Sequence, residues 1–164
     1  MQRQIKYLAI LLFSISLLAS CAGPRSLSVD ETYTAIPPAQ PLPEYFRKTQ
    51  ERNVIITINN VADEGRNYKN YAELFINGYL IKPDHEITNL TRNYSYHMLL
   101  QPGIYNIEAK YFASTGWKVE KFSIKTREKV MVFPDKKTFL TVDLLKNSWG
   151  GLAENPTFFK IRYE

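Results

Sequence analysis

Short runs of alternating apolar residues, separated by turn-forming residues, occupy the chain from Asn53 to its end. Val54, Ile56 and Ile58 are a clear example, because they fall on one face of an extended segment. A period of two is typical of strands that bury one face, and helical spacing of apolar residues is absent from this region. The pattern predicts an all-β fold, a single antiparallel β-sandwich over residues 53–164.

Two turn motifs predict where strands reverse. Asn77-Gly78 separates two apolar runs, and this pair favours a two-residue hairpin because both turn positions need a positive φ. A second hairpin is expected at Gln101-Pro102-Gly103, between the run that ends at Leu100 and a returning strand from Ile104 to Tyr111. Further strands are expected over residues 117–124, 140–144 and 159–163.

The beginning of the chain has the features of a secretory signal peptide. Arg3 and Lys6 precede a short apolar run, and Leu18-Ala19-Ser20 stands directly before the chain's one cysteine, Cys21. A basic start, a short apolar segment and small residues before the cut are typical of such peptides. The apolar run is shorter than the roughly 20 residues that span a membrane. We therefore expect residues 1–20 to be a signal peptide.

Cys21 has no second cysteine in the chain with which to form a disulfide. The four residues that end at Cys21 resemble the lipobox of bacterial lipoproteins, which implies acylation of Cys21, with palmitate for example, and anchoring to a membrane. Each buried methylene contributes about 0.8 kcal/mol, and stable attachment needs more than one chain. Ala22 follows, where Asp favours inner-membrane retention, so the resemblance implies a periplasm-facing outer-membrane lipoprotein. The alternative is an incidental cysteine beside an ordinary cleavage site.

The segment over residues 21–52 shows no sustained apolar periodicity and is rich in proline: Pro24, Pro37, Pro38, Pro41 and Pro43. Proline fixes φ and removes a backbone donor, so this segment is expected to be extended and poor at joining a sheet. In polyproline II form, at roughly 3.1 Å per residue, it would reach on the order of 90 Å. We predict a lipidated tether that holds the domain away from the lipid surface.

Composition narrows the class of partner. Loss of residues 1–20 leaves 144 of the 164 residues, enough for one modest core. It also removes two of the 21 basic residues, so the net charge falls from +5 to +3. This charge is mild and no cluster of Lys and Arg stands out, which argues against a nucleic-acid partner.

Residues 72–78, Ala-Glu-Leu-Phe-Ile-Asn-Gly, are an apolar run that ends in an Asn-Gly turn, and residues 100–109 begin with Leu-Gln-Pro-Gly before an alternating run. These motifs resemble the opening strand and turn and the Leu-x-Pro-Gly hairpin of the PEGA family of small extracytoplasmic β-sandwich modules. The resemblance covers the middle of the domain, from Ala72 to Leu145. The chain departs from the family at Lys82-Pro83-Asp84-His85 and extends past the module after Leu145. The resemblance implies a non-enzymatic module and provides no catalytic residues.

Two clusters carry chemistry-bearing side chains. Asp84-His85-Glu86 contains three metal-ligand types, but neighbouring strand residues point to opposite faces, which favours a solvated turn over a metal site. Ser95 and His97 share a strand face, a geometry that pairs a nucleophile with a base, yet the sequence indicates no third partner and no oxyanion hole. We therefore expect no catalytic residue, no metal and no cofactor.

Trp117 and Trp149 are the candidate contacts with a ligand or partner. Each lies beside glycine, and an exposed indole stacks on sugars or anchors a protein interface. The alternative is that both indoles cap the core at loop ends.

The sequence thus predicts a lipid-anchored, non-enzymatic binding or assembly module that contacts an envelope protein. A module that binds glycan or peptidoglycan through its loop aromatics is the second hypothesis. A hydrolase that uses His97 or His85 is a third and weaker one.

Overall fold

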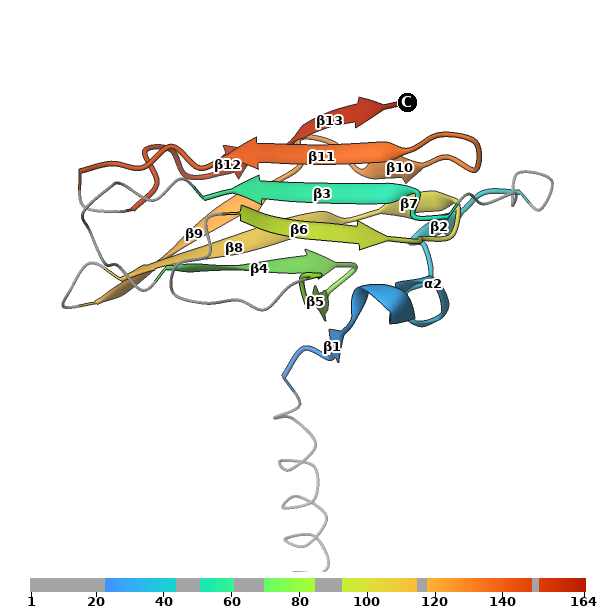
Figure 1. The fold of residues 1–164 in the computed structure, drawn as a ribbon, viewed down its shortest axis with the longest axis horizontal. Coiled ribbons are helices and arrows are strands. Elements are labelled where there is room, and N and C mark those ends of the chain that lie inside the picture. Colours follow the sequence, from blue (N-terminus) through green and yellow to red (C-terminus); the bar gives the residue numbers. More distant parts are fainter. Residues whose placement is uncertain (1–22, 44–50, 61–69, 85–92, 115–117, 149–150) are drawn as a thin grey trace, which may run out of the picture.

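The computed structural model describes residues 23–43, 51–60, 70–84, 93–114, 118–148 and 151–164. Strands dominate these residues, with a short 3-10 turn, η2 (Val29–Glu31), and a four-residue helix, α2 (Thr32–Ala35). In this part of the chain no helix has the length and apolar character needed to cross a membrane. The strands stack as two layers around one core (Figure 1).

One layer is built mainly by a six-stranded sheet. Its strands, in spatial order, are β1 (Ser26–Leu27), β5 (Tyr79–Ile81), β4 (Tyr71–Ile76), β8 (Ile107–Ser114), β9 (Val119–Lys125) and β12 (Thr157–Phe158). A three-stranded sheet continues this layer, in the order β10 (Val130–Val132), β7 (Gly103–Tyr105) and β2 (Gln40–Pro41). Asn106 alone separates β7 from β8, so the two sheets meet at a seam.

The other layer is a four-stranded sheet in the order β13 (Lys160–Tyr163), β11 (Thr138–Asp143), β3 (Val54–Asn59) and β6 (Asn93–Met98). The alternation predicted for β3 is confirmed, because Val54, Ile56 and Ile58 are all fully buried. β8 follows the same rule, and every second residue from Ile107 to Ala113 belongs to the core. The two layers bury these faces against each other, which is the main source of stability.

The predicted all-β sandwich is confirmed, with mixed rather than purely antiparallel pairing. β3 and β11 run parallel in the middle of their sheet, from Val54 beside Thr138 to Asn59 beside Asp143. β1 also runs parallel to β5, and β12 runs parallel to β9. Parallel neighbours need a long connection, and most of the domain lies between β3 and β11 in the chain.

The hairpin predicted at Asn77-Gly78 is confirmed. β4 and β5 pair in antiparallel fashion across it, with Ile76 opposite Tyr79. The φ angles of Asn77 and Gly78 are 47° and 85°, which suits a type I′ turn.

The second predicted hairpin is wrong. β6 pairs with β3, whereas β7 pairs with β10 and β2, so the chain crosses between layers at Gln101-Pro102. The backbone groups of Leu100 form hydrogen bonds with a side chain instead of with a neighbouring strand. Its N–H donates to Asn53 Oδ1 (2.9 Å), and its carbonyl accepts from Asn53 Nδ2 (2.8 Å). Pro102 has no N–H to contribute to a ladder.

The extended tether predicted over residues 21–52 is wrong for residues 26–41, which belong to the sandwich. β1 pairs with β5, β2 pairs with β7, and Leu27 and Ile36 are buried in the core. β2 lies at a sheet edge, where the missing N–H of Pro41 costs no ladder bond. The apolar side chains that dock the segment are too few to produce a periodic pattern in the sequence.

Candidate functional site

Several of the predicted site residues lie outside the described residues. These are Cys21, Trp117, Trp149, His85 and Glu86. The lipid attachment at Cys21, the partner contacts of the two Trp residues and the solvated turn at Asp84-His85-Glu86 therefore stay predictions. Ser95, His97 and Asp84 are described, and the structure brings these three together.

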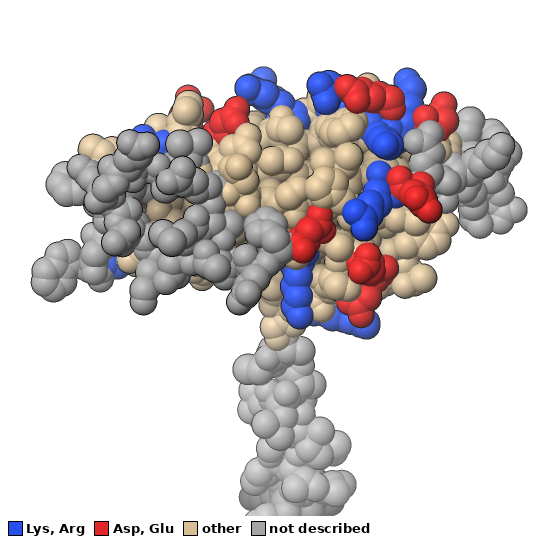
Figure 2. Space-filling model, viewed as in Figure 1, with Lys and Arg blue, Asp and Glu red and all other residues tan. Residues whose placement is uncertain are grey.

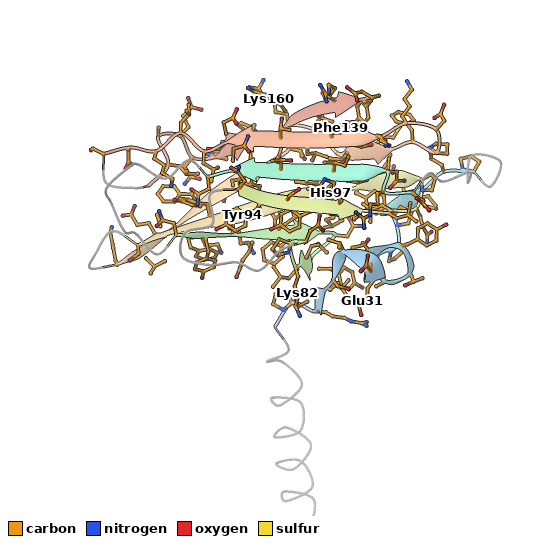
Figure 3. All side chains as sticks on the ribbon, viewed as in Figure 1. Glu31, Lys82, Tyr94, His97, Phe139 and Lys160 are labelled. Carbon is orange, nitrogen blue, oxygen red and sulfur yellow. The ribbon has the colours of Figure 1, made fainter. Side chains whose placement is uncertain are left out.

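His97 lies on β6, the edge strand of the four-stranded sheet, with its side chain on the outer face (Figure 3). Its Nδ1 lies 2.5 Å from Asp84 Oδ2, and its backbone N–H donates to the same oxygen (2.9 Å). Ser95 Oγ lies 3.3 Å from the same Nδ1. Asp84 is further held by its own N–H, which donates to the Ser95 carbonyl (3.1 Å). Asp84 lies thirteen residues from His97 in the chain, so the sequence pattern did not indicate it as the third partner.

The geometry of these three residues is not that of a Ser-His-Asp triad. In a triad the acid holds one ring nitrogen and the other nitrogen accepts the proton of the nucleophile. Here Asp84 and Ser95 both face Nδ1, so this nitrogen donates to the carboxylate and cannot also take the serine proton. The cluster therefore has a structural role: Asp84 holds the chain after β5 against the outer side of β6.

Metal-ligand types are not grouped in the described chain. In that part of the molecule no three or more His, Cys, Asp or Glu side chains lie close enough to hold an ion.

A hollow lies at the seam between the six-stranded and three-stranded sheets. It is an open groove of about 820 Å³, bordered by the Asn77-Gly78 turn, by Asn106 and by residues 125–129 of the β9–β10 connection. The side chain of Asn77 connects the segments that border the groove. Its Oδ1 accepts from the Asn106 N–H (2.9 Å), and its Nδ2 donates to the Pro37 carbonyl (2.9 Å). We call this hollow the seam groove.

The seam groove carries several exposed charges. Lys125, Arg127 and Lys129 line it together with Glu108 and Glu128. Tyr79 and the exposed Asn106 add an aromatic ring and an amide. The sequence analysis made no prediction for residues 125–129. The one available signal is the charged run Arg-Glu-Lys over residues 127–129, and such a run indicates an exposed segment without indicating a groove.

The outer edge of β13 is a second surface of interest. β13 ends its sheet, and no strand of the described chain pairs with its outer side. Glu164 and Lys137 exchange two backbone hydrogen bonds (2.7 and 3.0 Å). Because bonded pairs alternate along an antiparallel ladder, the N–H and carbonyl groups of Ile161 and Tyr163 point away from β11.

Charged side chains surround this edge. Figure 2 shows Lys, Arg, Asp and Glu gathered around the rim of the four-stranded face, while its centre carries neither colour. Lys160 and Arg162 of β13 have 80% and 67% of their side chains exposed. Arg162 also covers the ring of Phe139 at 4.9 Å. We call this strand edge, with Lys160 and Arg162, the upper edge.

Comparison with known proteins identified no relative. No family model matches the chain, and no curated protein or solved structure matches it either. The resemblance to PEGA modules therefore stays a prediction.

Proposed function

We propose that this protein is a lipid-anchored module of the cell envelope that binds a protein partner and catalyses no reaction. The anchor is Cys21, which is acylated through its sulfur and becomes the N-terminus when residues 1–20 are removed, and the location is the periplasmic face of an outer membrane. The sequence that ends at Cys21 supports the anchor, and Ala22 after it supports the location.

The observation that carries the proposal is the upper edge, where no described strand pairs with the outer side of β13. The outward N–H and carbonyl groups of Ile161 and Tyr163 are able to bond an added strand from a partner. Lys160 and Arg162 flank these groups. Each lies beside one carboxylate of this chain, Asp143 (3.9 Å) and Glu164 (3.2 Å), but both stay largely exposed and favour an acidic partner strand. Natural edges of this kind are short and charged, which limits uncontrolled association. A partner of matching charge gains both backbone and side-chain contacts here.

The seam groove favours a second candidate function, the binding of an envelope glycan. Tyr79 offers a ring face, and Asn106 and the charged side chains offer donors and acceptors to sugar hydroxyl groups or to acidic substituents. The predicted contacts Trp117 and Trp149 belong to the same hypothesis.

Site-specific photo-crosslinking in cells distinguishes these functions. A crosslinking residue replaces Lys160 at the upper edge, Arg127 at the seam groove, or the exposed Lys121 of β9 as a control position. We expect one discrete protein adduct from position 160 and none from position 121. Ile161→Pro removes an outward N–H while leaving the bonds to β11, so it abolishes the adduct.

Ile161→Val is the matched control and keeps the adduct. Thermal unfolding of both variants establishes that each is folded. If position 127 gives a glycan adduct and position 160 gives no protein adduct, the protein-binding proposal is rejected and glycan binding takes its place. A protein adduct that persists in Ile161→Pro rules out strand addition at the upper edge.

A further inference from the structure

We propose that the sandwich rests edge-on against the membrane, with β1, β5 and the η2–α2 segment facing the lipid. We call these elements the lower edge. The inference rests on the acyl anchor proposed at Cys21. In this arrangement the domain lies at the lipid headgroups, and residues 21–52 do not form the long spacer that the sequence predicted.

The chain joins the sandwich almost as soon as it leaves Cys21. The Arg25 carbonyl accepts from Leu80 N–H (3.1 Å), and the Leu27 carbonyl accepts from Lys82 N–H (2.9 Å). Leu27 is 2% exposed and packs in the core. Only residues 22–25 separate the anchor from β1, and they span at most about 18 Å when fully extended.

The residues after β1 cannot act as a tether either. Thr32 is buried, and its Oγ1 donates to the Leu99 carbonyl (2.9 Å). Ile36 is fully buried, and Gln40 pairs with Ile104 of β7. The proline-rich segment is therefore bound to the domain along most of its length. The anchor is connected to β1 through residues 22–25 alone.

The sheet order then decides which surface points away from the lipid. β1 and β12 are the two ends of the six-stranded sheet, five strand spacings or about 24 Å apart. Lys82 lies beside β1, where the described chain begins, whereas Lys160 lies at the opposite edge (Figure 3). An anchor at β1 therefore turns the upper edge, formed by β13, toward the periplasm.

Charge on the lower edge neither drives nor opposes this arrangement. Arg25 and Lys82 are exposed there together with Asp30 and Glu31. The Glu31 carboxylate accepts from the Ser28 N–H (2.8 Å) and hydroxyl (2.9 Å), and the backbone hydrogen bond is the main cause of its lowered pKa. Among the described residues of the lower edge these two cations balance these two anions, so the short covalent reach sets the orientation.

Depth-dependent fluorescence quenching tests the inference. The acylated chain is purified from membranes and reconstituted in vesicles of phosphatidylethanolamine and phosphatidylglycerol. Because acylation blocks Cys21 and the chain has no other cysteine, Lys82→Cys or Lys160→Cys introduces a single reactive thiol for a fluorophore. We expect a headgroup spin-labelled lipid to quench the label at position 82 several-fold more than the label at position 160.

The matched control inserts a flexible Gly/Ser linker of about 20 residues between Gly23 and Pro24, and it removes this difference. Equal quenching at the two positions in the natural chain, or an unchanged difference after linker insertion, overturns the orientation. Mass analysis of the N-terminal peptide and flotation with vesicles report the anchor separately. An acylated chain with equal quenching contradicts only the orientation, whereas an unacylated chain overturns the anchor and the orientation together.

Discussion

Asn77 has two separate roles: its backbone forms a turn, and its side chain forms hydrogen bonds to neighbouring segments. Its positive φ forms the turn between β4 and β5, a role that glycine fills equally well. Its amide group also connects the turn to Asn106 and to Pro37, and these bonds join the seam between the two sheets. Gly103 illustrates a different constraint, because a Cβ placed there would lie 2.7 Å from the Gln40 carbonyl oxygen.

We predict that Asn77→Gly lowers the free energy of unfolding by about 1–2 kcal/mol although it keeps the turn, because two hydrogen bonds are lost. Asn77→Asp is the matched control. It keeps the acceptor for Asn106 N–H and loses only the donor to Pro37, so it falls between the parent and Asn77→Gly. Urea unfolding followed by circular dichroism measures all three. A glycine variant as stable as the parent would show that the amide contacts contribute nothing.

The segment from β1 to β2 behaves as part of the sandwich. It adds a parallel strand beside β5 and an edge strand beside β7, and it covers the core with Leu27 and Ile36. The Gln101 side chain secures it further by donating to the Tyr33 carbonyl (3.0 Å). These contacts distinguish a docked segment from a spacer, whose side chains contribute nothing to folding.

We expect Leu27→Ala and Ile36→Ala each to lower the free energy of unfolding by about 2–4 kcal/mol, because each leaves a cavity in the core. Pro43→Ala, at an exposed position of the same segment, serves as the control and should change stability by less than about 0.5 kcal/mol. Chemical denaturation of the Cys21→Ser chain without residues 1–20 provides the measurement. If both core variants unfold like the parent, the segment is a tether after all.

The core as a whole depends on four tyrosines that are fully buried: Tyr94, Tyr96, Tyr105 and Tyr111. Burial raises the pKa of all four hydroxyl groups above the usual value of 10. Tyr105 donates to the Gln101 carbonyl (2.7 Å), whereas the Tyr96 hydroxyl has no partner among the described residues. The folded state therefore requires these phenols to stay neutral.

We predict a steep loss of stability above about pH 10. In the unfolded chain the four phenols ionise near that pH, whereas in the folded chain they keep their protons. Stability is thus fully present below the unfolded pKa and is lost as the pH rises toward the folded pKa. The slope is about 1.4 kcal/mol per pH unit for each tyrosine.

Absorbance of tyrosinate and circular dichroism, recorded in one alkaline titration, test this prediction. The four buried phenols should ionise together with loss of structure. Tyr96→Phe should reduce the slope by about a quarter and cost little stability at pH 7, because the hydroxyl that it removes has no hydrogen-bond partner within the described ranges. Ionisation of every tyrosine near pH 10 with the fold retained would refute the argument.

Local chemistry made some features predictable and left others hidden. The alternation of Val54, Ile56 and Ile58 identified a strand, because burial of one face needs only neighbouring residues. Asn77-Gly78 identified a hairpin for the same reason. The contact between Asp84 and His97 was hidden, because it depends on where the chain after β5 passes β6. The seam groove was hidden too, since it forms only where two sheets meet.

Short-range sequence patterns were enough to identify this chain as a β-protein, because alternation sets the strand faces and backbone sterics set the Asn77-Gly78 turn. Packing of the whole molecule selected which strands became neighbours. It placed β3 beside β11 rather than beside a strand close in sequence, and it brought Leu27 and Ile36 into the core. The physical reason is that alternation and turn propensity are properties of a few consecutive residues. Strand partners are instead chosen by burial summed over the whole molecule, to which distant segments contribute equally.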